Sequence, residues 1–263
     1  MATLTMGGTT TTTRRHMKIG IIGAGSIGST IARRLSRQGH DVAIANSRGP
    51  ETIDAAALST GARAVTAAEV VRDVEVLIVS VPMRRNADIA PFVRRSPADA
   101  VVIDTSNHYP DRDGAVRAFD DGQPESVWVS ELFGRPVAKA WNAIISQSFD
   151  TKAAAPGAPD RVAIPVAADR DEDRAVAMAL VEDTGFDAVD AGVLAESWRQ
   201  QPGAPVYCTD RRRDEVPAWL ARAVQQRAPE RRDLAMQTIG EYVREGGTVD
   251  GPFLVAINRA CYS

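Results

Sequence analysis

The sequence has few lysines, cysteines and histidines and lacks a long hydrophobic run. Lysine occurs only at Lys18, Lys139 and Lys152 among 31 basic residues, so arginine carries most of the positive charge. The formal net charge is −3, which argues against the basic field expected of a nucleic-acid-binding protein. No apolar stretch approaches the roughly 20 residues that a membrane-spanning helix needs. The composition therefore predicts a globular protein whose partners are neither nucleic acids nor membranes.

The two cysteines, Cys208 and Cys261, form no metal or redox spacing. Such sparse cysteine use favours a reducing, cytoplasmic location. One acidic cluster, at 169–173, could be taken for a metal site, but it stands at a predicted helix start. There Asp169 and Glu172 have the spacing of a capping box. We therefore predict a capped helix and no metal.

Residues 1–16 are polar and rich in threonine, without the apolar core of a secretory signal. We expect a disordered tail, with Met17 opening the fold. From there on, short apolar runs alternate with helical patterns. Predicted strands cover 18–22, 41–45, 76–81, 100–106, 136–141, 161–167 and 186–192. Predicted helices include one with Ile27, Ile31 and Leu35 on one face, followed by 50–61, 124–134 and 169–185.

This alternation is typical of a sheet with helices on both faces. We predict a Rossmann-type, doubly wound α/β fold with a mostly parallel sheet over residues 17–191. Residues 192–263 change in character, with a loop followed by helical patterns at 216–228, 231–247 and 252–260. We expect a small, mainly helical C-terminal region there, serving substrate binding or dimerisation.

A glycine-rich segment, "GAGSIG" at 23–28, follows the first predicted strand and opens a predicted helix. In this context Gly23 allows a tight turn, Gly25 lets the backbone approach a pyrophosphate, and Gly28 lets the helix pack close to the strand. The helix N-terminus then offers unpaired N–H groups to the phosphates. The segment predicts a dinucleotide-binding site.

The second predicted strand ends in "NSR", where NAD-binding proteins usually carry an acid for the adenosine ribose. Asn46 is neutral, the Ser47 hydroxyl can donate a hydrogen bond, and the Arg48 guanidinium matches phosphate oxygens. This trio predicts NADP(H), whose 2′-phosphate an acid would repel. The alternative is that Arg48 is one more surface arginine in an arginine-rich chain.

These residues belong to longer stretches that resemble a known family. The stretch "MKIGIIGAGSIGSTIARRLSRQGHDVAIANSRGPET" and the blocks "VIDTSNHYPDRDG", "VAKAWNAI", "GFDAVDAGVLAESWRQQPG" and "PVY" are similar to the coenzyme F420 (deazaflavin)-dependent NADP oxidoreductases, bacterial branch. The resemblance implies direct hydride transfer between NADP(H) and the deazaflavin, a closing C-terminal region and a homodimer. It departs from the archaeal members near Thr52, where their phosphate-binding lysine has no equivalent, and at Trp141 or Asn142, where they carry a histidine.

The resemblance also implies site residues. It matches Ala24, Gly25, Ser26 and Ile27 to the cofactor's pyrophosphate, and Ser47 and Arg48 to its 2′-phosphate. It matches Val81, Pro82 and Met83 to the ribose side, and Asn142, Ala143 and Ile144 to the nicotinamide.

The second substrate is expected beyond the strand that ends near residue 106, because ligands bind at the carboxyl ends of strands in open α/β sheets. The candidate pocket residues are Asn107, His108, Tyr109, Trp141, Ser197 and Arg199. His108 could donate a proton to a carbonyl or imine, or be only a polar contact. Arg199 could meet an anionic substrate or pair with a surface acid. Lys139, inside a predicted strand, is expected to be structural.

Three functions are compatible with this pattern. The first is hydride transfer between NADP(H) and a deazaflavin or flavin-like acceptor, which needs no protein acid or base. The second is reduction of a small carbonyl or imine. The third is an NADP(H)-sensing binding protein without turnover, which would have no second pocket over the nicotinamide.

Overall fold

The computed structural model describes residues 15–263, so the predicted tail lies outside the described residues except for Arg15 and His16. Its centre is an eight-stranded sheet in the order β3-β2-β1-β4-β5-β6-β7-β8. The strands are β1 (Lys18–Ile22), β2 (Asp41–Ala45), β3 (Arg63–Ala64), β4 (Val76–Val79), β5 (Val101–Asp104), β6 (Ala138–Lys139), β7 (Ala163–Ala168) and β8 (Asp187–Asp190). All neighbouring pairs are parallel except β6 and β7. The predicted Rossmann-type, mostly parallel sheet is confirmed.

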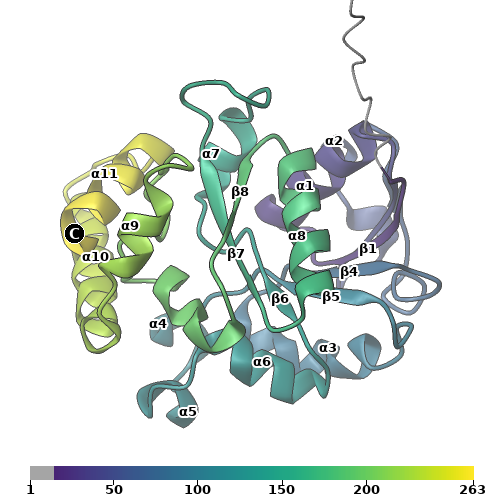
Figure 1. The fold of residues 1–263 in the computed structure, drawn as a ribbon, viewed down its shortest axis with the longest axis horizontal. Coiled ribbons are helices and arrows are strands. Elements are labelled where there is room, and N and C mark those ends of the chain that lie inside the picture. Colours follow the sequence, from purple (N-terminus) through teal and green to yellow (C-terminus); the bar gives the residue numbers. More distant parts are fainter. Residues whose placement is uncertain (1–14) are drawn as a thin grey trace, which may run out of the picture.

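Helices cover both faces of the sheet (Figure 1). The α-helices are α1 (Ser26–Arg37), α2 (Ala55–Leu58), α3 (Asn86–Val93), α4 (Pro110–Asp113), α5 (Arg117–Asp120), α6 (Glu125–Phe133), α7 (Ser146–Thr151), α8 (Asp171–Asp183), α9 (Val216–Ala221), α10 (Ala228–Arg244) and α11 (Gly251–Tyr262). Short 3-10 helices are η1 (Pro50–Thr52), η2 (Met83–Arg85), η3 (Leu194–Gln200) and η4 (Gln225–Arg227). None of the helices within residues 15–263 is long and apolar enough to cross a bilayer.

The central strands are apolar on both sides because each sheet face has its own core. On one face Ile21 and Ile78 pack with Ile31 of α1. On the other, Leu77 and Val79 pack in a second core with residues of α3 and α6. Successive side chains of a strand point to opposite faces, so near-continuous apolar runs indicate a sheet buried on both sides.

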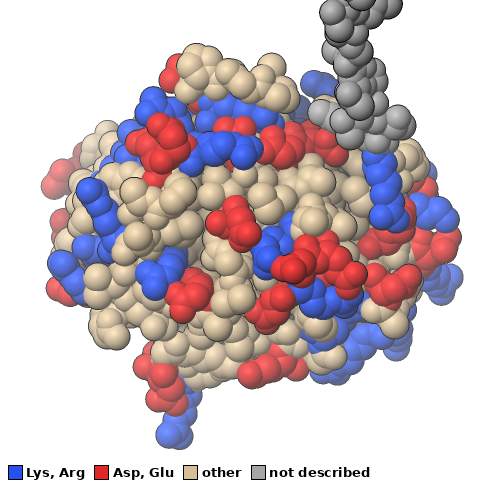
Figure 2. Space-filling model, in the orientation of Figure 1, with Lys and Arg blue, Asp and Glu red and all other residues tan. Residues whose placement is uncertain are grey.

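Acidic and basic side chains are interspersed over the face shown in Figure 2.

Three local predictions were wrong. Asp169 does not cap α8: Arg170 is the residue before the helix, and Asp169 Oδ1 instead accepts from the backbone N–H of Leu194 (2.8 Å). That bond ties the start of η3 to the end of β7. The predicted helix 50–61 divides into η1 and α2, because Asp54 starts a new helix by accepting from Ala56 N (2.8 Å). The predicted helix 216–228 ends at Ala221, and η4 follows.

The C-terminal helices α9, α10 and α11 lie together at one end of the molecule (Figure 1). They are joined to the sheet by shared hydrophobic clusters. Val216 and Leu220 of α9 pack with Ala163 and Val189 of β7 and β8. Ala235 and Val255, from α10 and α11, pack with Ala143 in the loop after β6. This second contact brings the helical region to the carboxyl end of the parallel strands.

Candidate functional site

The glycine loop connects β1 to α1, and the protein itself requires two of its three glycines. Gly23 has φ +111°, and a Cβ there would lie 2.0 Å from Ser80 O. A Cβ on Gly28 would lie 2.0 Å from Gly23 O. A Cβ on Gly25 would meet no atom within 4 Å. The space before Gly25 is therefore open, as the close approach of a pyrophosphate requires.

The N-terminus of α1 has the features of an anion site. Gly25 is its N-cap and provides no side-chain hydrogen bond, and the first turn contains no acidic residue. The first N–H groups of a helix lack intrahelical partners, and the helix dipole favours a negative charge there. Together with the open space at Gly25, this end of the helix fits a dinucleotide's phosphates.

The loop after β2 is shaped by Asn46. Its Oδ1 accepts from the backbone N–H groups of Arg48 (2.9 Å) and Gly49 (3.0 Å), while its Nδ2 donates to Thr52 Oγ1 (2.8 Å). Ser47 and Arg48 are exposed. The Arg48 guanidinium forms no hydrogen bond or ion pair with any residue that the structure describes. The loop thus holds a cationic side chain without an acidic partner among residues 15–263.

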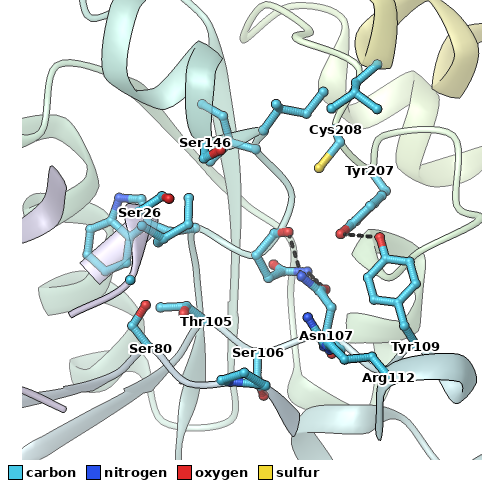
Figure 3. Close-up of a pocket in the computed structure, with 18 of the residues that line it drawn as sticks. Ser26, Ser80, Thr105, Ser106, Asn107, Tyr109, Arg112, Ser146, Tyr207 and Cys208 are labelled. Atoms are coloured by element: carbon cyan, nitrogen blue, oxygen red, sulfur yellow. Dashed lines mark hydrogen bonds between the residues drawn. The ribbon is translucent and has the colours of Figure 1, made fainter. Parts of the chain in front are cut away.

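A cavity of about 430 Å³ lies at the carboxyl ends of β1, β4, β5 and β6, under α10 and α11 (Figure 3). It unites residues predicted for the cofactor with residues predicted for the second substrate. The predicted residues in its lining are Gly25, Ser26, Ile27, Val81, Pro82, Asn107, Tyr109, Trp141, Asn142 and Ile144.

Much of the lining was not predicted as part of the site. These residues include Ser80, Thr105, Ser106, Arg112, Ile145, Ser146, Tyr207, Cys208, Met236, Ile239, Leu254, Asn258 and Tyr262. Tyr207 lies in the "PVY" block of the family resemblance, which was a usable signal. The residues of α10 and α11 carried none, since a helical pattern does not indicate which sheet edge the helix will cover.

Two tyrosines meet across the wall of the cavity. The hydroxyls of Tyr109 and Tyr207 are 2.9 Å apart (Figure 3). Burial raises the pKa of both phenols above the ordinary value. Burial likewise raises the pKa of the Cys208 thiol beside them. This side of the cavity therefore remains uncharged around neutral pH, apart from the Arg112 guanidinium over the Tyr109 ring (5.3 Å).

Three candidate substrate residues do not line the cavity. His108 is buried, its Nε2 is 2.8 Å from Gly114 O, and its ring packs on Phe119. It points away because it stands between Asn107 and Tyr109, which both point inward. Ser197 is also buried outside the lining. Arg199 donates to Glu196 (2.7 Å), so the alternative of a paired arginine applies.

Eight cofactor candidates are also absent from the lining: Gly23, Ala24 and Gly28 of the glycine loop, Asn46, Ser47 and Arg48 after β2, and Met83 and Ala143. The last two have partners elsewhere. The Met83 sulfur accepts from Asn86 Nδ2 (3.4 Å) in the core, and the Ala143 carbonyl accepts from Cys208 N (3.0 Å). Both are buried and support the cavity wall from behind.

Lys139 lies beneath the cavity floor and is fully buried. Its Nζ donates to Ser126 Oγ (2.9 Å) and to the carbonyl of Ser106 (3.2 Å), and it lies 3.4 Å from Glu125 Oε2. Burial raises the pKa of Glu125. Because Ser106 lines the cavity, Lys139 supports its floor from below, in the structural role predicted for it.

Comparison with known proteins bears on the half of the site around the glycine loop. Residues 18–108 match the model of a family described as NADP oxidoreductase, coenzyme F420-dependent. The predicted resemblance to this family is confirmed for these residues. The matched segment contains the glycine loop, the end of β2 and the loop after β5 as far as His108. It does not extend to the C-terminal helices.

Three relatives extend this comparison. The protein YjhV of Escherichia coli (strain K12) is 54% identical over 54 residues, which are 20% of this chain and 39% of that relative. A hypothetical protein from Sinorhizobium meliloti has a similar structure, with a TM-score of 0.64, 28% identity, and coverage of 74% of this chain and 94% of the other. A protein from Arthrobacter sp. FB24, provisionally named an F420-dependent NADP reductase, has a TM-score of 0.54, 19% identity, and coverage of 69% and 87%.

Proposed function

We propose that this protein transfers hydride directly between NADP(H) and a flat aromatic acceptor of the deazaflavin or flavin type, such as coenzyme F420. The observation that carries the proposal is the single cavity that joins Gly25 and Ser26 to Tyr109 and Tyr207. A dinucleotide held at the glycine loop would extend its nicotinamide toward the tyrosine side. NADP(H) supplies the hydride chemistry, and the protein supplies orientation.

The cavity wall suits an acceptor that needs no proton from the protein. Among the described residues that line it, Arg112 alone carries a charge. Met236, Ile239 and Leu254 provide apolar surface against which a ring system could pack. This apolar surface would exclude water from two rings stacked on it and so disfavour side reactions.

We propose NADP(H) rather than NAD(H) as the physiological cofactor because of the loop after β2. Ser47 and Arg48 are exposed there, and no described acid neutralises Arg48. A 2′-phosphate would supply the missing negative charge. This proposal depends on the β2 loop and not on the identity of the acceptor.

The reduction of a small carbonyl or imine is a second candidate, favoured by one observation. The Tyr109–Tyr207 pair places phenol hydroxyls at the cavity wall, where one could protonate such a substrate. The raised pKa of both groups argues against this role, because a phenol that resists ionisation is a poor acid. A sensor without turnover is also disfavoured, since it would not need the tyrosine-lined half of the cavity.

The test is a stoichiometric assay of NADPH oxidation against a panel of acceptors: oxidised coenzyme F420, flavin mononucleotide, a quinone, and small ketones and imines. We expect oxidation with a ring acceptor and none with the ketones or imines. Oxidation of NADPH with an imine but with none of the ring acceptors would instead support the reduction of small carbonyls or imines. Silence against every acceptor, with NADPH still bound, would support the sensor.

The homodimer stays a proposal taken from the family resemblance. On α10, Leu234 and Val243 are each 51% exposed, which is apolar surface that a second copy would cover.

A further inference from the structure

Three amide side chains from distant parts of the sequence form a chain at the cavity. Asn107 follows β5, Asn142 follows β6, and Gln200 ends η3. Asn142 Nδ2 donates to Asn107 Oδ1 (3.0 Å), and Gln200 Nε2 donates to Asn142 Oδ1 (3.0 Å). Gln200 is fully buried and Asn142 nearly so, whereas Asn107 is partly exposed in the lining.

Backbone carbonyls determine which way two of these amides face. The Gln200 carbonyl accepts from Asn142 Nδ2 (2.7 Å), and the Asn142 carbonyl accepts from Asn107 Nδ2 (3.0 Å). A carbonyl oxygen can only accept, so turning either amide over would place two acceptors against each other. The orientation of Asn107 is therefore set by the Asn142 carbonyl. Gln200 acts one step further back, because its carbonyl and its Nε2 both bond to the Asn142 side chain and hold Asn142 in place.

In this orientation one amide N–H of Asn107 has no partner among the described residues. An asparagine amide has two N–H groups. Asn142 uses both, on Gln200 O and Asn107 Oδ1. Asn107 uses one, on Asn142 O, and its second N–H has no partner among residues 15–263. Since Asn107 lies at the cavity between Ser106 and Tyr109, this donor is available to a ligand there (Figure 3).

The backbone beside Asn142 needs support. Trp141 has φ +55°, which a bulky residue adopts only when its surroundings hold it. The bonds from Gln200 to the Asn142 side chain, and the Trp141 Nε1 bond to Thr184 Oγ1 (3.3 Å), provide that support. On the other side, Arg112 Nη2 donates to the Asn107 carbonyl (2.6 Å) and fixes its backbone.

We propose that Asn107 donates this N–H to a carbonyl oxygen of a ligand in the cavity, and that Gln200 is the positioning residue that directs it. This rests on the proposed function for the presence of such a ligand. The carbonyl has two sources: the carboxamide of the nicotinamide, or a ring carbonyl of the acceptor. In either case the site selects a hydrogen-bond acceptor at that point and rejects a donor.

Binding measurements on the full chain test the Asn107 contact. Asn107→Asp and Asn107→Ala both remove the donor. If the nicotinamide is the source, NADPH binds about tenfold more weakly, as expected for one lost hydrogen bond. The fragment 2′-phospho-ADP-ribose, which has no nicotinamide, binds as before. If the acceptor is the source, NADPH affinity is unchanged, and riboflavin binds about tenfold more weakly to the protein saturated with NADP+.

A second pair of variants tests Gln200, with its neighbour as the control. Gln200→Met keeps the length of the side chain and the backbone carbonyl but removes the bond from Nε2 to Asn142 Oδ1, and we expect it to weaken binding of the same ligand as the Asn107 variants do. Gln201→Met should leave both affinities unchanged. In the Asn107→Ala background, Gln200→Met should have no further effect, because the donor that it directs is already absent.

Several results would overturn this assignment. Equal weakening of 2′-phospho-ADP-ribose would show a general disturbance of the site, and so would additive effects of the two substitutions. The proposed Asn107 contact would also be ruled out if the Asn107 variants bound NADPH as the parent does and their riboflavin binding were either unchanged or undetectable. None of these measurements requires turnover, so silence in the acceptor panel and failure of this inference are separate outcomes.

Discussion

Residues 23–48 and the C-terminal residues 192–263 contribute to the same cavity region in contrasting ways. The first segment is a continuous stretch of loop, helix α1 and strand β2 that presents backbone N–H groups and exposed polar side chains. The second contributes buried or apolar side chains, such as Tyr207 and Leu254, from helices and loops that also pack against the sheet. The phosphate site that we propose is therefore local in sequence, whereas the proposed acceptor side combines residues from distant parts of the chain.

The largest expected effect separates folding from binding within the glycine loop. Gly28→Ala should lower the free energy of unfolding by about 2–3 kcal/mol, because the new Cβ would lie 2.0 Å from Gly23 O. Gly25→Ala should stay within about 1 kcal/mol of the parent, since no atom lies within 4 Å. Denaturant titration measures both.

The same pair should behave in the reverse order toward the cofactor. Gly25→Ala should bind NADPH at least about tenfold more weakly, because its methyl group occupies the space left for the pyrophosphate. Normal NADPH affinity in a folded Gly25→Ala protein would show that the dinucleotide does not approach this glycine.

The next effect concerns the β2 loop. Arg48→Ala should weaken NADPH binding by about tenfold to a hundredfold, the range for one charge-assisted hydrogen bond, and leave NADH binding nearly unchanged. Arg37→Ala, an exposed arginine at the far end of α1, is the matched control and should affect neither. Calorimetry with both dinucleotides measures this, and equal losses for NADPH and NADH would contradict an NADP preference.

A smaller effect should appear as a pH dependence of stability on the acceptor side. Burial raises the pKa of Tyr109 and Tyr207 in the folded protein. The unfolded chain then releases these protons first, so stability is complete below the ordinary tyrosine pKa near 10 and falls as the pH rises above it. Each phenol contributes a slope of at most about 1.4 kcal/mol per pH unit.

Replacing one phenol should make this slope shallower. We expect Tyr207→Phe to do so, whereas Ile144→Val, a change in the same lining without a titrating group, should not. Unfolding titrations between pH 8 and 11 would reveal the difference. Parallel curves for Tyr207→Phe and the parent would indicate that Tyr207 is not protected from solvent.

The contrast between the two segments also explains what could be predicted from the sequence. Gly23, Gly25 and Gly28 act through backbone geometry, so their spacing was enough to predict the turn after β1 and the start of α1. His108 was predicted for the pocket but lies outside the lining, between two residues that belong to it, because the sequence does not indicate which of three neighbours points inward. Gln200 was missed because its partners, Asn142 and Asn107, lie about 60 and 90 positions earlier.

The antiparallel pairing of β6 with β7 was also not predictable from the apolar pattern. The pattern of apolar residues marks β7 as a buried strand in either direction. Its direction depends on how the chain between Lys139 and Ala163 returns to the sheet, and that path passes through the cavity loop and α7. The apolar pattern therefore predicts that a strand is buried, whereas the direction of the strand depends on the connection that precedes it.

Cys208 forms part of the cavity wall, where burial keeps its sulfur protonated. Thiolates, and not thiols, attack disulfides, peroxides and electrophiles. If the proposed hydride transfer takes place in this cavity, the protonated sulfur beside it would not divert electrons into a mixed disulfide or a sulfenic acid. Cys208 therefore contributes a small apolar surface to the cavity wall and no reactive group.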